Sequence, residues 1–162
     1  MRALLDVNVL IALLDAAHIH HEVATTWLRG EAEHGWASCP ITQNGCIRVM
    51  SQPAYPGALP TAEVASRFAE AAMAPAHSFW PDDINLATAP ALQWQRILGH
   101  RQITDAYLLA LAVRHGGRFV TFDRRITLET VAGAADENLT ILGQSRARSS
   151  SSRSSSSTGP SN

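Results

Sequence analysis

Residues 4–14 of the chain read Leu4-Leu5-Asp6-Val7-Asn8-Val9-Leu10-Ile11-Ala12-Leu13-Leu14. The apolar residues before Asp6 suit a short buried strand, and the pattern from Val7 onward is compatible with a helix that buries most of its surface. Asp6 then stands where the strand ends, and in open α/β sheets ligands bind at the carboxyl ends of the strands. An acid there also has a simpler use, because it can cap the next helix by accepting free N–H groups. The choice between these interpretations depends on the partners of Asp6.

The composition indicates one soluble domain with an acidic body. The 162 residues carry a formal net charge of −1, and a chain of this length can bury a hydrophobic core. All 13 basic residues are arginines, and residues 1–143 hold 10 of them against 14 acidic side chains. Nucleic-acid binding would therefore depend on local arginines. Without a membrane span, a signal peptide or paired cysteines, the chain is expected to be cytoplasmic, with Cys39 and Cys46 reduced in the core.

Strands and helices alternate along the sequence. Short strands are predicted at residues 2–5, 36–39, 77–80, 118–122 and 139–142. Helices are predicted from residue 7, at 21–34, from Pro40, from the cap Thr61, at 90–98, from the cap Thr104 and at 124–130. This order predicts an α/β fold in three layers, with a central, mostly parallel sheet of four to five short strands and helices on both faces. Residues 1–143 form the folded domain, and residues 144–162 are a Ser/Arg-rich tail expected to be disordered.

Four polar residues share one position relative to this predicted backbone. Asp6 and Asp123 end strands, whereas Gln43 and Asp105 lie in the first turns of helices. In a parallel sheet such positions collect along one edge, where helix N-termini stabilise carboxylates. Three carboxylates without lysine partners would repel one another unless a divalent cation neutralised them. Because carboxylates, waters and phosphates are ligands of Mg²⁺ and Mn²⁺, the pattern favours a metal site that activates water against a phosphodiester.

Each acid taken alone also has a structural explanation. Asp105 after Thr104 is an ordinary helix start, and Asp123 before Arg124 and Arg125 could form an ion pair or a cap. The joint pattern nevertheless favours the metal site over these separate explanations. A phosphotransfer domain with Asp6 as nucleophile, as in haloacid-dehalogenase-like or receiver folds, is set aside. Such domains rely on a positioned lysine, and the chain contains none.

Four blocks of the sequence resemble the signature blocks of the PIN-domain family, in particular the VapC-type toxins of VapBC toxin–antitoxin pairs. The blocks are Leu4-Leu5-Asp6-Val7-Asn8-Val9-Leu10, Pro40-Ile41-Thr42-Gln43-Asn44-Gly45-Cys46-Ile47-Arg48-Val49, Thr104-Asp105-Ala106-Tyr107-Leu108-Leu109-Ala110-Leu111-Ala112 and Phe119-Val120-Thr121-Phe122-Asp123. The resemblance spans residues 1–143 in order and spacing. It implies an endoribonuclease that uses Mg²⁺ or Mn²⁺ and cuts RNA, of the tRNA or rRNA class, by water attack. It also implies a homodimer held inactive by a cognate VapB-type antitoxin.

The resemblance assigns roles to individual residues. Asp6, Asp105 and Asp123 become the metal-binding acids, and together with Gln43 they make up the catalytic set. Supporting roles fall to Asn8, which would hydrogen-bond to the first acid, and to Thr104 or Thr121, which would orient neighbours or water. The arginines that could meet RNA phosphates are Arg48, Arg101, Arg124 and Arg125.

Gln43 departs from the family pattern, which usually has glutamate in this block. An amide can offer its carbonyl oxygen to water near a metal, but it adds no charge and cannot act as a base. Asp82 and Asp83, which follow the third predicted strand, are candidates for a substituting acid, or else form a solvated loop pair. Because the surrounding block is intact, we interpret Gln43 as a tolerated variant. The alternative is a catalytically impaired PIN-like module that acts by binding RNA and antitoxin.

Overall fold

All five strands lie in one parallel sheet in the computed structural model, which describes residues 1–143. The strands are β1 (Ala3–Leu5), β2 (Trp36–Ser38), β3 (His77–Phe79), β4 (Arg118–Thr121) and β5 (Leu139–Ile141). Their order in the sheet is β3-β2-β1-β4-β5, so β1 lies at the centre. From β1 the chain adds β2 and β3 on one side of it, and then returns to add β4 and β5 on the other side. The carboxyl ends of β1 and β4 therefore flank the point where the strand order reverses, which is where α/β sheets bind ligands.

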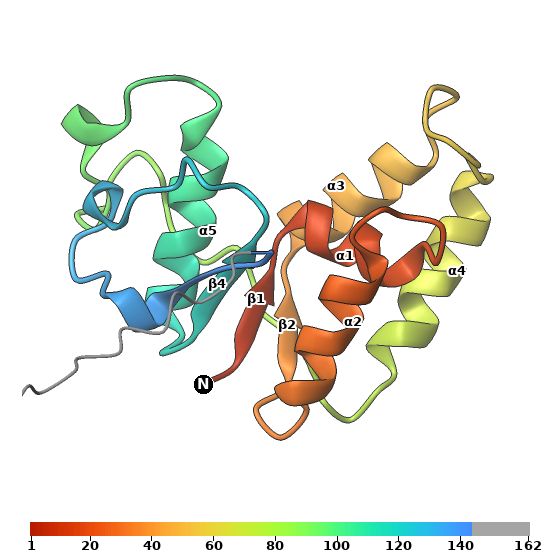
Figure 1. Cartoon of the computed structure of the whole chain (residues 1–162). Coiled ribbons are helices and arrows are strands. Elements are labelled where there is room, and N and C mark those ends of the chain that lie inside the picture. Colours follow the sequence, from red (N-terminus) through yellow and green to blue (C-terminus); the bar gives the residue numbers. More distant parts are fainter. Residues whose placement is uncertain (144–162) are drawn as a thin grey trace, which may run out of the picture.

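Helices cover both faces of this sheet, as the sequence predicts (Figure 1). The helices are α1 (Val7–Leu14), α2 (His21–Gly30), α3 (Pro40–Met50), α4 (Thr61–Ala72) and α5 (Gln102–Arg114). Helices α1 to α4 lie on one side, whereas α5 lies on the other side with the long connection before it. Helix α5 is buried almost all round from Ala106 to Ala112, because it packs between the sheet and that connection.

Alternation along the strands decides which face each side chain meets. Leu4 and Phe119 belong to the core on the α5 side, whereas Leu5 and Val120 belong to the core on the α1 side. Since successive strand residues point to opposite faces, Thr121 follows Val120 on the side of α5. Leu5 pairs with Val120, so Asp6 comes next to Thr121 at the end of the two strands. The register therefore brings two of the candidate site residues together.

Several predicted helix boundaries were wrong. The helix at residues 21–34 ends at Gly30, and the chain reaches β2 through turns and Gly35, which has a positive φ of 70°. The helix expected at 90–98 is reduced to a 3₁₀ turn at Trp94–Arg96, and Leu92 instead pairs with Val131 in an antiparallel bridge. The helix expected at 124–130 is a 3₁₀ turn at Leu128–Thr130. The apolar residues in these short segments pack against the core, but their spacing does not correspond to a regular helix.

The predicted caps were also wrong in two places. Helix α4 begins at Thr61, so Pro60 occupies the cap position and no side chain caps the helix. Helix α5 begins two residues before Thr104, and the Gln102 side chain accepts the Leu98 N–H at 2.8 Å. Asp105 still falls in the first turn of α5, so its expected place relative to the sheet is unchanged.

Three further expectations concern the termini, the cysteines and the membrane. No helix within residues 1–143 is long and apolar enough to cross a bilayer. Cys39 and Cys46 are free and buried, and burial raises their pKa values to about 11 and about 12, which keeps both thiols protonated. The predicted tail, residues 144–162, lies outside the described residues.

Candidate active site

Asp6 is fixed at the junction of β1 and α1. Its backbone N–H donates to the Val120 carbonyl at 2.9 Å, which extends the pairing of β1 and β4 by one residue. Its carboxylate accepts the Val7 N–H at 2.7 Å, so Asp6 is the N-cap of α1. The capping interpretation of the sequence is thus confirmed. Capping uses only one carboxylate oxygen, however, and the second one has another partner.

Thr121 connects two of the acids. Its hydroxyl donates to Asp6 Oδ2 at 2.7 Å, and its oxygen accepts the Asp123 N–H at 3.0 Å. Thr121 is fully buried and lies 115 positions from Asp6 in sequence. A buried hydroxyl that donates to a carboxylate and accepts from a backbone N–H has a defined orientation. The expected orienting role therefore falls to Thr121.

Asp123 is held by Arg125, two residues further on. The Arg125 guanidinium contacts both carboxylate oxygens, with Nη2–Oδ2 at 2.6 Å and Nε–Oδ1 at 3.0 Å, and the Arg125 N–H donates to Oδ1 at 2.8 Å. These hydrogen bonds lower the pKa of Asp123, chiefly through the Arg125 side chain. The ion pair expected between Asp123 and the two arginines that follow it is present, and its partner is Arg125. Because the Arg125 side chain is 73% exposed, the pair can open at little cost.

Asp105 lies on α5, in the layer on the other side of the sheet. Together with Asp6 and Asp123 it makes up what we call the acidic group. The pKa of Asp105 is raised to about 6, chiefly by burial and then by the charges of Asp6 and Asp123. Burial also raises the pKa of Asp6, with a smaller contribution from Asp123, against the lowering effect of the Thr121 and Val7 hydrogen bonds. The negative charges of the three aspartates therefore repel one another. One edge of the sheet gathers more negative charge than its surroundings neutralise.

A hard divalent cation suits this group in charge and in ligand type. Carboxylate oxygens are the ligands that Mg²⁺ and Mn²⁺ prefer, and mutual repulsion is the condition that a cation would relieve. Within residues 1–143, no three His, Cys, Asp or Glu side chains are already gathered as a metal-binding cluster. The Arg125 side chain engages both oxygens of Asp123 in this structure. The residues present fit a cation, provided that Arg125 releases Asp123.

Gln43 lies in the first turns of α3, just beyond the end of β2. Its amide nitrogen donates to the Ser38 hydroxyl at 3.0 Å, and Ser38 is fully buried. Helix α3 packs against α1 so closely that a Cβ on Gly45 would come within 2.5 Å of the Val7 side chain. Helix α3 therefore packs against the start of α1, and the Gln43 side chain is fixed at Ser38, the last residue of β2. Sequence reasoning missed Ser38, although its place at the end of a predicted strand was a usable signal.

Two expected supporting residues are exposed. Asn8 lies on the outer face of α1, and Thr104 lies on the outer face of α5. Within the described part of the chain neither side chain hydrogen-bonds to an acid, and the two bonds to the Asp6 carboxylate come from Val7 and Thr121. Their proposed roles in the site are therefore not supported by contacts.

The acids considered as substitutes for glutamate lie elsewhere. Asp83 accepts from Arg114 Nε at 2.9 Å, and Arg114 is in the last turn of α5, at the end opposite Asp105. Asp82 raises the pKa of Cys39 and of Tyr107, which places its charge beside these residues. The charges acting on Asp105 come instead from Asp6, Asp123 and Arg125. Neither Asp82 nor Asp83 joins the acidic group.

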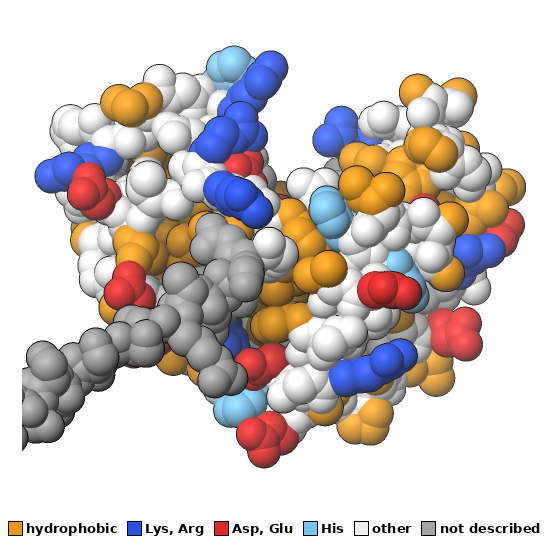
Figure 2. Space-filling model, viewed as in Figure 1, with side chains coloured by type: hydrophobic (Ala, Val, Ile, Leu, Met, Phe, Trp, Pro, Cys, Tyr) orange, Lys and Arg blue, Asp and Glu red, His pale blue; other side chains and the backbone are white. Residues whose placement is uncertain are grey.

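The four candidate RNA-contacting arginines are all exposed: Arg48 in the last turns of α3, Arg101 before α5, and Arg124 and Arg125 after β4. Figure 2 shows basic side chains along one rim of the hollow between the α5 side and the α1–α4 side of the molecule. Because the chain contains no lysine, these are arginines. A basic rim beside an acidic group is the charge pattern expected for a site that binds a phosphodiester chain.

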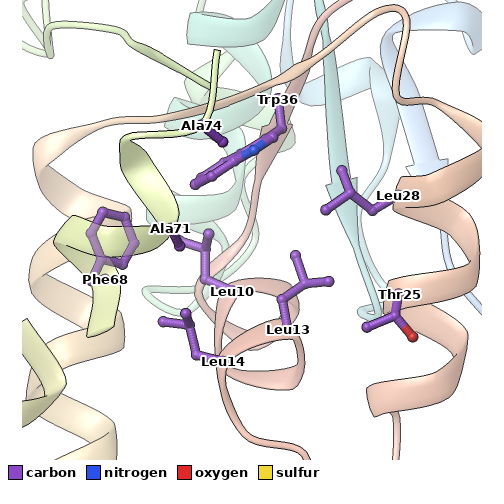
Figure 3. Close-up of a pocket in the computed structure, with 9 residues that line it drawn as sticks. All are labelled: Leu10, Leu13, Leu14, Thr25, Leu28, Trp36, Phe68, Ala71 and Ala74. Carbon is purple, nitrogen blue, oxygen red and sulfur yellow. The ribbon is translucent and has the colours of Figure 1, made fainter. Parts of the chain in front are cut away.

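An apolar pocket lies between α1, α2 and α4 (Figure 3). Its volume is about 310 Å³, and the residues that line it are Leu10, Leu13, Leu14, Thr25, Leu28, Trp36, Phe68, Ala71 and Ala74. The lining contains no ionisable group, so the pocket offers no acid–base chemistry. It is separate from the acidic group.

Comparison with known proteins gives one family match and several relatives. The PIN domain model matches residues 3–133. "Ribonuclease VapC44" of Mycobacterium tuberculosis is 50% identical over 142 residues, which cover 88% of this chain and 100% of that protein. "Ribonuclease VapC39" of the same organism is 40% identical over 84% of this chain and 99% of its own length. "Ribonuclease VapC38" is 42% identical over 75% of this chain and 84% of its own length.

Proposed function

The chain belongs to the PIN-domain family and is of the VapC type, and from this premise we propose that it is a toxin with endoribonuclease activity. The observation that supports the proposal most directly is that the charges of Asp6 and Asp123, which follow β1 and β4, act on Asp105 and raise its pKa. The names of the relatives supply the reaction class, since each is called a ribonuclease. The acidic group and the arginines beside it supply suitable chemistry on this chain.

Asp6, Asp105 and Asp123 would hold a divalent cation, Mg²⁺ or Mn²⁺. When bound, the cation would act as a Lewis acid that activates water and stabilises the charge developing on the phosphodiester. Thr121 orients the Asp6 carboxylate by donating to it, and this hydrogen bond lowers the pKa of Asp6 against the larger raising effect of burial. The exposed arginines would hold the RNA backbone against the acidic edge. Each residue thus has a defined task in positioning substrate or cation.

The chain would also bind a cognate VapB-type antitoxin and act as a homodimer. The VapC-type membership supports the antitoxin partner. A free site of this kind would cut cellular RNA continuously, so inhibition by a partner is the expected state in the cell.

A cleavage assay tests the proposed activity. Protein freed of antitoxin is incubated with labelled total RNA in Mg²⁺, in Mn²⁺ and in chelator, beside an Asp6→Asn variant. We expect discrete cuts that need the metal and are at least about 100-fold slower in the variant. Folded wild-type protein that cuts nothing with either metal would instead favour the alternative, a module impaired by Gln43 that acts by binding RNA and antitoxin.

Arg125 should compete with the cation for Asp123. Replacing it in Arg125→Gln is expected to raise the pKa of Asp123 toward its ordinary value and to tighten Mn²⁺ binding by about threefold, because a competing charge is removed. Calorimetric titration of the RNA-free protein measures the affinity. Arg124→Gln is the matched control, because within residues 1–143 Arg124 hydrogen-bonds to the Gly143 carbonyl and forms no ion pair with Asp123. Equal Mn²⁺ affinity in all three proteins would show that Arg125 does not guard the site.

A further inference from the structure

Gln43 is the last member of a directed series of hydrogen bonds that starts at the backbone of α4. His77 Nδ1 lies 3.1 Å from the carbonyl oxygen of Ala72, and His77 Nε2 lies 2.8 Å from Ser38 Oγ. Ser38 Oγ in turn accepts the Gln43 amide N–H at 3.0 Å. Ser38 and His77 lie on the paired strands β2 and β3, and Gln43 lies in α3, which follows β2.

The direction of this series follows from the chemistry of its members. The Ala72 carbonyl can only accept, so His77 Nδ1 must carry the hydrogen. In neutral His77 the other nitrogen is then an acceptor, and the single hydroxyl hydrogen of Ser38 points to it. Ser38 Oγ has no further hydrogen to give, so Gln43 must present its NH₂ group to Ser38. Burial and the nearby Arg2 charge lower the pKa of His77, which keeps it neutral.

The oxygen of the Gln43 amide is therefore directed away from Ser38. Within residues 1–143 no donor is bonded to Gln43 Oε1, and this atom is not among the buried polar atoms that lack a partner. Among residues 1–143 the oxygen is therefore left open, at the end of the sheet where β2 adjoins β1 and Asp6. Without the series, either end of an amide could face this space, because its oxygen and NH₂ group are nearly equal in shape.

We propose that Ser38 and His77 are positioning residues that hold the Gln43 amide with its oxygen outward, as the hydrogen-bond acceptor for water at the acidic edge. The inference rests on the proposed nuclease function. It explains how an amide can serve where the family usually has glutamate, since only the oxygen end offers an acceptor. Ser38 is not itself a nucleophile, because it is fully buried and cannot meet a substrate.

A carboxylate at position 43 has two equivalent oxygens and needs no such orientation. It would instead accept from Ser38, whose hydroxyl hydrogen would then turn away from His77. His77 Nε2 would lose its donor and would itself have to donate, which favours protonated His77. An amide at position 43 is thus compatible with neutral His77, whereas a carboxylate there favours protonated His77.

The kinetics of four proteins test the proposal: wild type, Ser38→Ala, Gln43→Glu and the double variant. In the Gln43 protein, Ser38→Ala is expected to lower kcat for RNA cleavage about tenfold, because the amide loses its orientation. In the Gln43→Glu protein the same change should cost no more than about twofold, because either carboxylate oxygen can accept. Ser51→Ala is the matched control, because the buried Ser51 hydroxyl at the other end of α3 has no hydrogen-bond partner within residues 1–143. Equal losses from Ser38→Ala in both backgrounds would overturn the proposal.

A second measurement needs neither metal nor activity. ¹⁵N NMR of metal-free protein at pH 7.5 should show His77 as the Nδ1–H tautomer, with the signal assigned by its loss in His77→Gln. One Gln43 side-chain amide proton should exchange slowly, and Ser38→Ala should abolish that protection. Gln43→Glu should raise the pKa of His77. An Nε2–H tautomer, or amide protons that exchange freely in the wild type, would overturn the proposal.

The two measurements separate this inference from the proposed function. Wild-type protein that fails to cleave RNA but gives the expected NMR result would refute the nuclease and, with it, the catalytic purpose of the amide. Wild-type protein that cleaves RNA but shows the wrong tautomer would leave the nuclease intact and refute the positioning role.

Discussion

Replacing Asp105 by asparagine is expected to abolish RNA cleavage and to stabilise the metal-free protein at the same time. Cleavage should fall at least about 100-fold, because one of three carboxylates for the cation is lost. Stability should rise because the wild-type carboxylate is costly: its pKa in the folded protein is raised to about 6 by burial and by Asp6 and Asp123. Loss of activity with gain of stability is the signature of a residue kept for function.

The pH dependence of that stabilisation has a defined sign. The Asp105 carboxyl loses its proton near pH 4 in the unfolded chain but near pH 6 in the folded protein, so ionisation costs the folded state between these values. The advantage of Asp105→Asn should therefore be absent below about pH 4 and complete above about pH 6 to 7. Allowing for solvent screening, we expect about 1 to 2 kcal/mol, or about 3 to 6 °C in Tm.

Thermal melts of metal-free protein at pH 4 and pH 7.5 measure this effect. Asp83→Asn is the matched control, because Arg114 lowers the pKa of Asp83 and that carboxylate is favourable where it is. The control should keep cleavage and should gain no stability. Destabilisation by Asp105→Asn at pH 7.5 would show that the three aspartates do not repel one another in the folded protein.

Replacing Thr121 by valine should lower RNA cleavage, because Thr121 connects Asp6 and Asp123 by hydrogen bonds. Valine keeps the volume but removes the donor to Asp6 Oδ2 and the acceptor for the Asp123 N–H. Since that donor lowers the pKa of Asp6, its loss should raise the pKa further above the ordinary value. We expect cleavage at pH 7 to fall at least about tenfold and stability to fall by about 1 to 3 kcal/mol, because buried polar groups lose partners.

The pH profile distinguishes this effect from general damage. Cleavage should need ionised Asp6, so the acidic limb of kcat/KM should move to higher pH in Thr121→Val. Thr104→Val is the matched control, because Thr104 is exposed and makes no hydrogen bond to an acid within the described residues. An unchanged pH profile in Thr121→Val would argue against the hydrogen bond from Thr121 as a cause that lowers the pKa of Asp6.

The strand-end acids could be predicted from the sequence because their signal is local. An apolar strand followed by Asp6 or Asp123 marks the carboxyl end of that strand whatever its neighbours are. Asp105 was found for the same reason, since it stays in the first turn of α5 even though the helix begins earlier than expected. Parallel pairing of β1 with β4 then brings the ends together.

The connections among these acids could not be predicted, because they depend on register. Thr121 reaches Asp6 only because β1 and β4 pair in a register that places Leu5 beside Val120. The pairing of Arg125 rather than Arg124 with Asp123 depends on the turn that follows β4. The series from His77 to Gln43 depends on β3 lying beside β2, and a strand order is a property of the whole sheet.

The sequence also failed to predict the structure of short segments, where helices were expected and 3₁₀ turns are found. Residues 90–98 have apolar residues near helical spacing, but Leu92 is used in a bridge to Val131. Here tertiary pairing overrides local preference, as it commonly does for segments of one or two turns.

Binding of Mn²⁺ to the metal-free protein tests most directly whether the three aspartates act together on one divalent cation. Calorimetric titration at pH 7.5 would compare wild type with Asp105→Asn and Asp83→Asn. We expect one site per chain, with affinity at least about tenfold weaker in Asp105→Asn and unchanged in Asp83→Asn. Equal binding by all three proteins would place the cation elsewhere and contradict the assignment of the acidic edge as the catalytic site.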